Sequence, residues 1–82
     1  MARILITGAT GAIGGALARA YAQDGYHLIL QGRQLAELDA LVDVCNAAGG
    51  SAEAHALDLS DIERTRTWCE EILSQGVPKI VY

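Results

Sequence analysis

The residues with the clearest chemical potential form a glycine-rich turn, Thr7-Gly8-Ala9-Thr10-Gly11-Ala12-Ile13-Gly14, which directly follows the apolar run Ile4-Leu5-Ile6. Glycine allows a tight turn after a strand, a close approach of the backbone to an anion, and close packing of the next helix on the strand. The amides at a helix N-terminus then face the anion, and the helix dipole favours its charge. The spacing therefore predicts a site for the pyrophosphate of a dinucleotide.

A second candidate is Arg33, which follows Gly32 after the apolar run 27–31. In a dinucleotide-binding fold, an acidic residue at this point would bind the adenosine ribose. Gly32 carries no carboxylate that would repel a phosphate, and a guanidinium can bind a phosphate through two hydrogen bonds. The pair therefore favours NADP(H) over NAD(H), although Arg33 could also be a solvated residue at a helix start. Glu37 and Asp39 fall within the next helix, where we expect them to be poorly placed for the ribose.

Short apolar runs alternate with helical periodicity along the chain, which is the pattern of a parallel sheet covered by helices. We expect strands at 3–7, 27–31, 53–57 and 79–82, and helices at 12–23, at 34–48 and from a Ser60/Glu63 capping box to just before Gly76. Right-handed crossovers place the strands in the order 3-2-1-4. The predicted fold class is α/β, a partial Rossmann (doubly wound) fold with about four parallel strands and three helices.

The apolar residues of each expected helix predict which of its sides is buried. These stripes are Ile13, Leu17, Ala20 and Tyr21 in the first helix; Leu35, Leu38, Leu41, Val42 and Cys45 in the second; and Ile62, Trp68, Cys69, Ile72 and Leu73 in the third. Both cysteines are thus expected to be reduced core thiols, since their spacing fits neither zinc nor redox motifs. His27 and His55 are expected to be packed strand residues without partners, and no metal site is expected.

The glycine-rich turn resembles the cofactor loop of the short-chain dehydrogenase/reductase family, which reads Thr-Gly-x-x-x-Gly-x-Gly in one branch and Thr-Gly-x-x-Gly-x-x-Gly in another. Gly8, Gly11 and Gly14 match the second form, and Ala12 stands where the first has its middle glycine. The resemblance extends over nearly the whole chain. It implies a dinucleotide cofactor, hydride transfer to or from a carbonyl or alcohol, and cofactor contacts from Thr7, Gly8, Thr10, Gly11, Ala12, Ile13, Gly14, Arg33, Asp58 and Leu59.

The stretch Asp58-Leu59-Ser60-Asp61 looks like the short acidic motif that the family places at its adenine pocket. The resemblance implies that Asp58 accepts from the exocyclic amine of adenine and that Leu59 supplies an apolar wall and a backbone contact. The alternative is that Asp58 and Ser60 only cap the third helix. Both roles are compatible if Ser60 is the cap and Asp58 stays free.

The family's catalytic Tyr-x-x-x-Lys pair has no counterpart in this sequence. None of the three tyrosines has a lysine four residues later, and Lys79 is the only lysine. We therefore expect no catalytic residue here, and a chain that is truncated relative to the family and inactive alone. The alternatives are a stand-alone nucleotide-binding or interaction module, and a member of the nucleotide-sugar epimerase branch, which the loop spacing favours.

The chain has 82 residues and a net charge of −4, which limit it to one small domain and disfavour nucleic acid or a membrane surface as partners. No stretch is long and apolar enough to span a bilayer, and no cleavable signal pattern occurs, so a cytoplasmic location is expected. The apolar fourth strand would leave an unpaired edge, which predicts a homo-oligomer formed through that strand.

Overall fold

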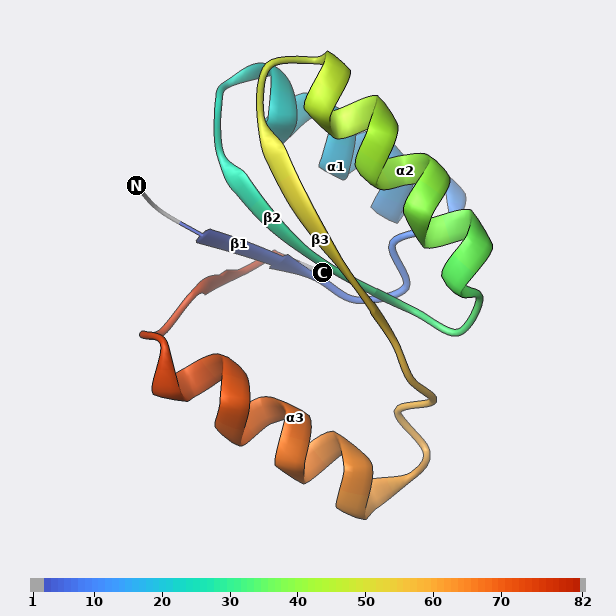
Figure 1. The fold of residues 1–82 in the computed structure, drawn as a ribbon, viewed down its shortest axis with the longest axis vertical. Coiled ribbons are helices and arrows are strands. Elements are labelled where there is room, and N and C mark those ends of the chain that lie inside the picture. Colours follow the sequence, from blue (N-terminus) through green and yellow to red (C-terminus); the bar gives the residue numbers. More distant parts are fainter. Residues whose placement is uncertain (1–2, 82) are drawn as a thin grey trace.

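The computed structural model describes residues 3–81. Its elements follow the order β1 (Arg3–Ile6), α1 (Ala12–Gln23), β2 (His27–Gly32), α2 (Leu35–Ala47), β3 (Ser51–Ala56), α3 (Ile62–Ser74) and β4 (Lys79–Ile80). The four strands form one parallel sheet in the order β3-β2-β1-β4 (Figure 1). Both the alternation of elements and the strand order confirm the predicted fold. Tyr82, the expected last residue of the fourth strand, lies outside the described residues.

Helices α1 and α2 cover one face of the sheet, and α3 covers the other (Figure 1). This layering follows from the alternation of side chains along each strand. Ile4, Ile6, Leu28 and Leu30 are buried in the core with α1 and α2. Leu5 and Ile29 point the opposite way and pack with Leu57, Trp68 and Ile72 in a second, smaller core under α3.

The buried side of α1 consists of small residues, namely Gly14, Gly15, Ala18 and Ala22. The predicted stripe was therefore wrong in part for this helix: Ile13 is 60% exposed and Ala20 is exposed, whereas Leu17 and Tyr21 are half-buried and pack against the core. The physical reason is distance, because a helix that packs this closely on the loop and on β1 has room only for small side chains.

The other two helices bury fewer of their predicted residues than expected. In α2, Leu38, Leu41 and Cys45 are buried, whereas Leu35 is 53% exposed. In α3, only Trp68 and Ile72 are buried, and the rest of the predicted stripe is exposed: Ile62, Cys69 and Leu73. Cys69 is thus a surface thiol. A single narrow line of α3 contacts the sheet, so a full apolar stripe cannot be buried on it.

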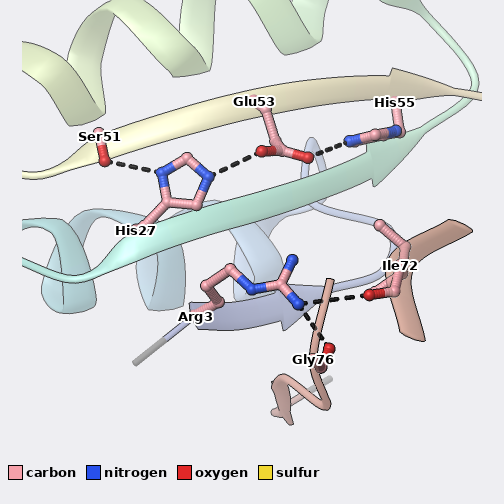
Figure 2. A network of polar contacts seen from close by, with 7 residues as sticks. All are labelled: Arg3, His27, Ser51, Glu53, His55, Ile72 and Gly76. Carbon is pink, nitrogen blue, oxygen red and sulfur yellow. Dashed lines mark hydrogen bonds and ion pairs between the residues drawn. The ribbon is translucent and has the colours of Figure 1, made fainter. Parts of the chain in front are cut away.

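Both ends of α3 are held by polar contacts. At its N-terminus the cap is Asp61, whose carboxylate accepts a hydrogen bond from the Arg64 amide at 3.1 Å, so the predicted Ser60 cap was wrong. At its C-terminus, Arg3 of β1 donates to the carbonyl oxygens of Ile72 and Gly76 (Figure 2). A cation at this end also complements the helix dipole. These contacts tie α3 to the first strand.

None of the helices within residues 3–81 combines the length and the apolar character that crossing a membrane requires.

Candidate functional site

The glycine-rich turn lies at the carboxyl end of β1, where ligands bind in open parallel sheets. Gly8 has a φ of +59°, a left-handed conformation that strongly favours glycine. Its carbonyl oxygen accepts a hydrogen bond from the Gly11 amide at 3.1 Å, which closes the turn. The chain then enters α1 through Gly11, the N-cap, which makes no side-chain hydrogen bond to the helix. The first amides of α1 are therefore left without a side-chain cap, as an anion site requires.

The end of the turn packs directly against its beginning. A Cβ on Gly14 would lie 2.5 Å from the Gly8 carbonyl oxygen and 2.9 Å from the Ala9 Cα. A Cβ on Gly11 would lie 3.4 Å from the same oxygen, at the edge of ordinary contact. The first turn of α1 thus packs on the start of the glycine-rich turn at a distance that leaves no room for a side chain at Gly14. This is the close packing of helix on strand that the third glycine of such a turn allows.

A pocket of about 610 Å³ opens at the carboxyl ends of the first three strands. Its lining residues are Thr7, Gly8, Thr10, Gly11, Gln31, Gly32, Arg33, Gln34, Glu37, Asp58 and Leu59. The structure therefore brings the turn, the end of β2 and the segment after β3 together around one space.

Three of the predicted contact residues do not line this pocket. Ala12 lies in a neighbouring groove between α1 and α2, which Thr10, Gly11 and Glu37 also line. Ile13 is exposed at the start of α1, and Gly14 is buried beneath the turn. Gly14 can thus act on the site only through the shape of the turn.

Asp58 is engaged rather than free. Its Oδ1 atom accepts hydrogen bonds from the Ser60 amide at 3.0 Å and from the Ser60 hydroxyl at 2.8 Å. These two bonds, and more weakly the nearby charge of Arg33, hold the pKa of Asp58 below its ordinary value. The expectation that Ser60 caps α3 and leaves Asp58 free was wrong, because Ser60 instead closes a local turn on Asp58. The pocket therefore contains an ionised carboxylate near a guanidinium.

Sequence reasoning missed three polar residues of the pocket. Gln31 is 3% exposed, although it ends a strand of buried apolar residues. Gln34 is the N-cap of α2, and Glu37 lies in the first turn of that helix. Glu37, which we expected to be poorly placed for the ribose, lines the pocket. The sequence does contain a signal for Gln31, because it is a polar residue that directly follows three buried apolar residues of the strand. A polar side chain in such a place requires hydrogen-bond partners in the interior.

The two histidines lie outside this pocket, and both have partners. His27 Nε2 and His55 Nε2 contact the two oxygens of Glu53 at 2.8 and 2.6 Å, and His27 Nδ1 contacts the Ser51 hydroxyl at 2.7 Å (Figure 2). Burial opposes ionisation of Glu53, but the hydrogen bonds and charges of both histidines outweigh it and lower its pKa.

The expectation of histidines without partners was wrong, because the register sets His27 opposite Ser51 on the neighbouring strand and places Glu53 between the two rings. Within residues 3–81, no group of three His, Cys, Asp or Glu side chains is arranged to hold a metal ion.

Comparison with known proteins places the chain in a family. The sequence model of the family described as short chain dehydrogenase matches residues 2–80. No curated protein matches the chain.

Several solved structures share the fold. A metagenomic short-chain oxidoreductase in complex with NADP has 32% identity and a TM-score of 0.89, with 96% of this chain and 37% of that chain covered. A short-chain dehydrogenase from Sphingobium yanoikuyae in complex with NADPH has 28% identity and a TM-score of 0.85, with 95% and 31% covered. An NADH-dependent reductase complexed with NAD has 26% identity and a TM-score of 0.77, with 92% and 31% covered.

The chain therefore spans about a third of the length of these solved structures. The family match covers nearly all of the sequence, and the glycine-rich turn lies in that matched part. The chain belongs to the short-chain dehydrogenase/reductase family.

Proposed function

We propose that this chain is the NAD(P)(H)-binding portion of a short-chain oxidoreductase that acts on a carbonyl or alcohol. One observation carries the proposal. Seven of the ten predicted contact residues line a single pocket at the carboxyl ends of β1, β2 and β3. Solved family members of similar fold are described as complexes with NADP, NADPH or NAD. The bound cofactor supplies or accepts the hydride.

Each part of the pocket suits one part of the dinucleotide. The turn Thr7–Gly14 offers backbone amides and a close approach to the pyrophosphate. Arg33 can bind a 2′-phosphate on the adenosine ribose. Asp58, ionised and exposed, can accept from the adenine amine, and Leu59, 39% exposed, offers an apolar surface to the ring. Ile13 is exposed at the start of α1, where we propose that its side chain contacts the cofactor.

Arg33 supports NADP(H) as the preferred cofactor, while Glu37 opposes that preference in part. Arg33 is exposed and lies near Asp58 across the pocket. Its hydrogen bonds to a phosphate would be charge-assisted, which strengthens them. Glu37 lines the same pocket with a negative charge that would repel the 2′-phosphate. We infer a net preference for the phosphorylated cofactor, because Arg33 can form direct hydrogen bonds with it.

We further propose that the chain binds cofactor without turning over a substrate by itself. A tyrosine acts as a general acid near neutral pH only when a cation lowers its pKa. Tyr21 and Tyr26 instead contact each other edge to face, with ring centres 5.6 Å apart. They therefore serve packing.

The exposed edge of β4 supports self-association. The strand pairs with β1 through Ile4↔Lys79 and Leu5↔Ile80, and it is the last strand on that side of the sheet. Ile80 is 67% exposed, and Val77, just before the strand, is 84% exposed. An open apolar edge of this kind can pair with a second copy.

Calorimetric titration of the 82-residue chain with NADPH and with NADH tests the proposed function. We expect NADPH to bind and NADH to bind more weakly. The absence of binding by either cofactor would overturn the proposal, whereas tighter binding of NADH would overturn only the preference for NADP(H). An absorbance assay at 340 nm with simple aldehydes and ketones should show no oxidation of NADPH above the rate without protein.

A further inference from the structure

Gln31 forms a bridge between two segments that border the pocket. Its Oε1 atom accepts a hydrogen bond from the Gly8 amide at 3.0 Å, and its Nε2 atom donates to the Leu57 carbonyl oxygen at 2.8 Å. The backbone contributes a third bond, because the Ala9 amide donates to the Gln31 carbonyl oxygen at 2.9 Å. One residue of β2 therefore holds both the start of the glycine-rich turn and the end of the segment that leads into Asp58.

The burial of this side chain makes both bonds consequential. Gln31 is 3% exposed and is the one buried polar or charged residue between positions 3 and 81. A carboxamide carries an acceptor and a donor in one plane, and here each is used on a different segment. Without it, the Leu57 carbonyl oxygen would lose its partner in the buried interior, and the part-buried Gly8 amide would lose the bond that orients it.

We propose that Gln31 is a positioning residue that fixes the distance between the pyrophosphate side and the adenine side of the pocket. The inference rests on the proposed function. Gly8 begins the turn that faces the phosphates, and Leu57 immediately precedes Asp58 and Leu59, which face the adenine. Because one rigid group holds both, the two halves of a dinucleotide meet sites whose separation is already set. Such preorganisation favours binding by lowering the cost of ordering the site.

A second consequence concerns the amides that remain for the phosphates. Gln31 occupies the Gly8 amide, and the Gly8 carbonyl oxygen occupies the Gly11 amide. Because the Ala9 amide also donates to the Gln31 carbonyl oxygen, the Thr10 amide and the amides at the start of α1 remain for the anion. The carboxamide thus determines which end of the turn meets the phosphates.

Two variants of Gln31 and one control variant distinguish an effect of Gln31 on the geometry of the cofactor site from a general loss of stability. Gln31→Met keeps the length of the side chain and removes both hydrogen bonds. Gln31→Glu keeps an acceptor for Gly8 but offers Leu57 a donor only when its carboxyl group is protonated. Cys45→Ala shortens a fully buried side chain of the first core near the C-terminus of α2, at the end of that helix away from the pocket, so it destabilises the fold without touching either partner of Gln31. All are studied at a temperature where circular dichroism shows them folded.

Two quantities are measured for each variant. They are the affinity for NADP⁺ and the rate of hydrogen exchange of the Gly8 amide in the chain without cofactor. We expect Gln31→Met to bind NADP⁺ about tenfold more weakly, as the loss of one or two net hydrogen bonds implies. We also expect its Gly8 amide to exchange about tenfold faster, while Cys45→Ala keeps the wild-type affinity. For Gln31→Glu, the affinity relative to wild type at the same pH should recover as the pH falls through the pKa of the new carboxyl group.

The outcomes are distinguishable. Wild-type affinity in Gln31→Met, or an equal loss in Cys45→Ala, would overturn the positioning role. If Gln31→Met does not fold, the pH series of Gln31→Glu decides, and a flat ratio to wild type overturns the inference. If the wild-type chain does not bind NADP⁺, the proposed function fails, and unchanged exchange of Gly8 in the variants would also show that Gln31 does not hold the turn.

Discussion

Gly14 lies so close to Gly8 that a Cβ on Gly14 would be 2.5 Å from the Gly8 carbonyl oxygen, a separation that such atoms essentially never show. The first turn of α1 is therefore pressed against the start of the loop. Gly8 itself needs its left-handed conformation, with a φ of +59°. The two glycines thus serve different physical needs, one of space and one of backbone angle.

Alanine at Gly14 and at the neighbouring Gly15 should have opposite effects on stability. Gly14→Ala forces the loop or helix to shift and should lower the free energy of unfolding by about 1–3 kcal/mol. At Gly15 a Cβ would meet only the Ala9 carbonyl oxygen at 3.5 Å, an ordinary contact. Because alanine favours helix, Gly15→Ala should raise the free energy by up to about 1 kcal/mol. Urea unfolding followed by the fluorescence of Trp68 measures both, and equal effects would contradict the close packing of Gly14 on Gly8.

Arg33 and Glu37 should shift cofactor preference in opposite directions. Arg33→Ala removes charge-assisted hydrogen bonds worth about 1.5–3 kcal/mol and should lower the ratio of NADPH to NADH affinity by about tenfold to hundredfold. Glu37→Gln removes a repulsive charge from the exposed pocket wall and should raise the ratio by about twofold to fivefold. Titration calorimetry with both cofactors measures the ratio. Arg66→Ala, an exposed site on α3, serves as the control, and an unchanged ratio in Arg33→Ala would mean that Arg33 does not bind the 2′-phosphate.

Glu53 should make stability depend on pH in the acidic range. Its pKa in the folded chain lies below the ordinary value of 4.5, so its ionised form stabilises the fold. This contribution is present above pH 4.5 and is lost as the pH falls toward the lowered value. Urea unfolding should show a wild-type advantage over Glu53→Gln at pH 7 that shrinks below pH 4.5. Glu70→Gln, at an exposed site of α3, should show no such trend. A difference that is constant with pH would contradict the proposed pairing with the histidines.

The two thiols should differ sharply in reactivity. Burial raises the pKa of Cys45, against a weaker opposing effect of the Arg19 charge, and its Sγ atom lies 3.9 Å from the Ala18 carbonyl oxygen. Cys69 is exposed on α3. Since the thiolate is the reactive form, a disulfide reagent at pH 8 should modify Cys69 quickly and Cys45 only on unfolding. The fast phase should vanish in Cys69→Ser and persist in Cys45→Ser; the reverse pattern would refute the burial of Cys45.

The fold and most of the pocket could be predicted because they depend on local pattern and on the handedness of crossovers. Alternating strands and helices fix the strand order, and that order brings the carboxyl ends of β1, β2 and β3 together. Thr7, Arg33 and Asp58 each follow or end one of these strands, so their gathering around one pocket follows from topology.

The remaining features depend on pairings that no single segment reveals. The partnership of His27 with Glu53 requires the register between β2 and β3. The prediction of the buried side of α1 failed because it was based on hydrophobicity, which favours burial of Ile13 over Gly14. The space beneath the helix is too small for a side chain at Gly14, so glycine is buried there and Ile13 is exposed. At the start of α3, two adjacent capping residues compete, and Ser60 is used by Asp58.

The bridge formed by Gln31 was missed for a similar reason. Its partners, Gly8 and Leu57, are 23 and 26 residues away along the chain. The pattern of buried residues in one strand does not predict that the Gly8 amide and the Leu57 carbonyl oxygen lie within hydrogen-bond distance of Gln31.

A titration of the ¹⁵N-labelled chain with NADP⁺, followed through the amide chemical shifts in two-dimensional NMR spectra, tests the proposed cofactor site most directly. We expect saturable shifts confined to residues 7–14, 31–37 and 57–60, with little change at His27, Glu53 and His55. The absence of saturable shifts, or shifts centred on the groove between β3 and α3 that His55, Thr67 and Trp68 line, would contradict the assignment of the cofactor to the pocket at the carboxyl ends of the strands.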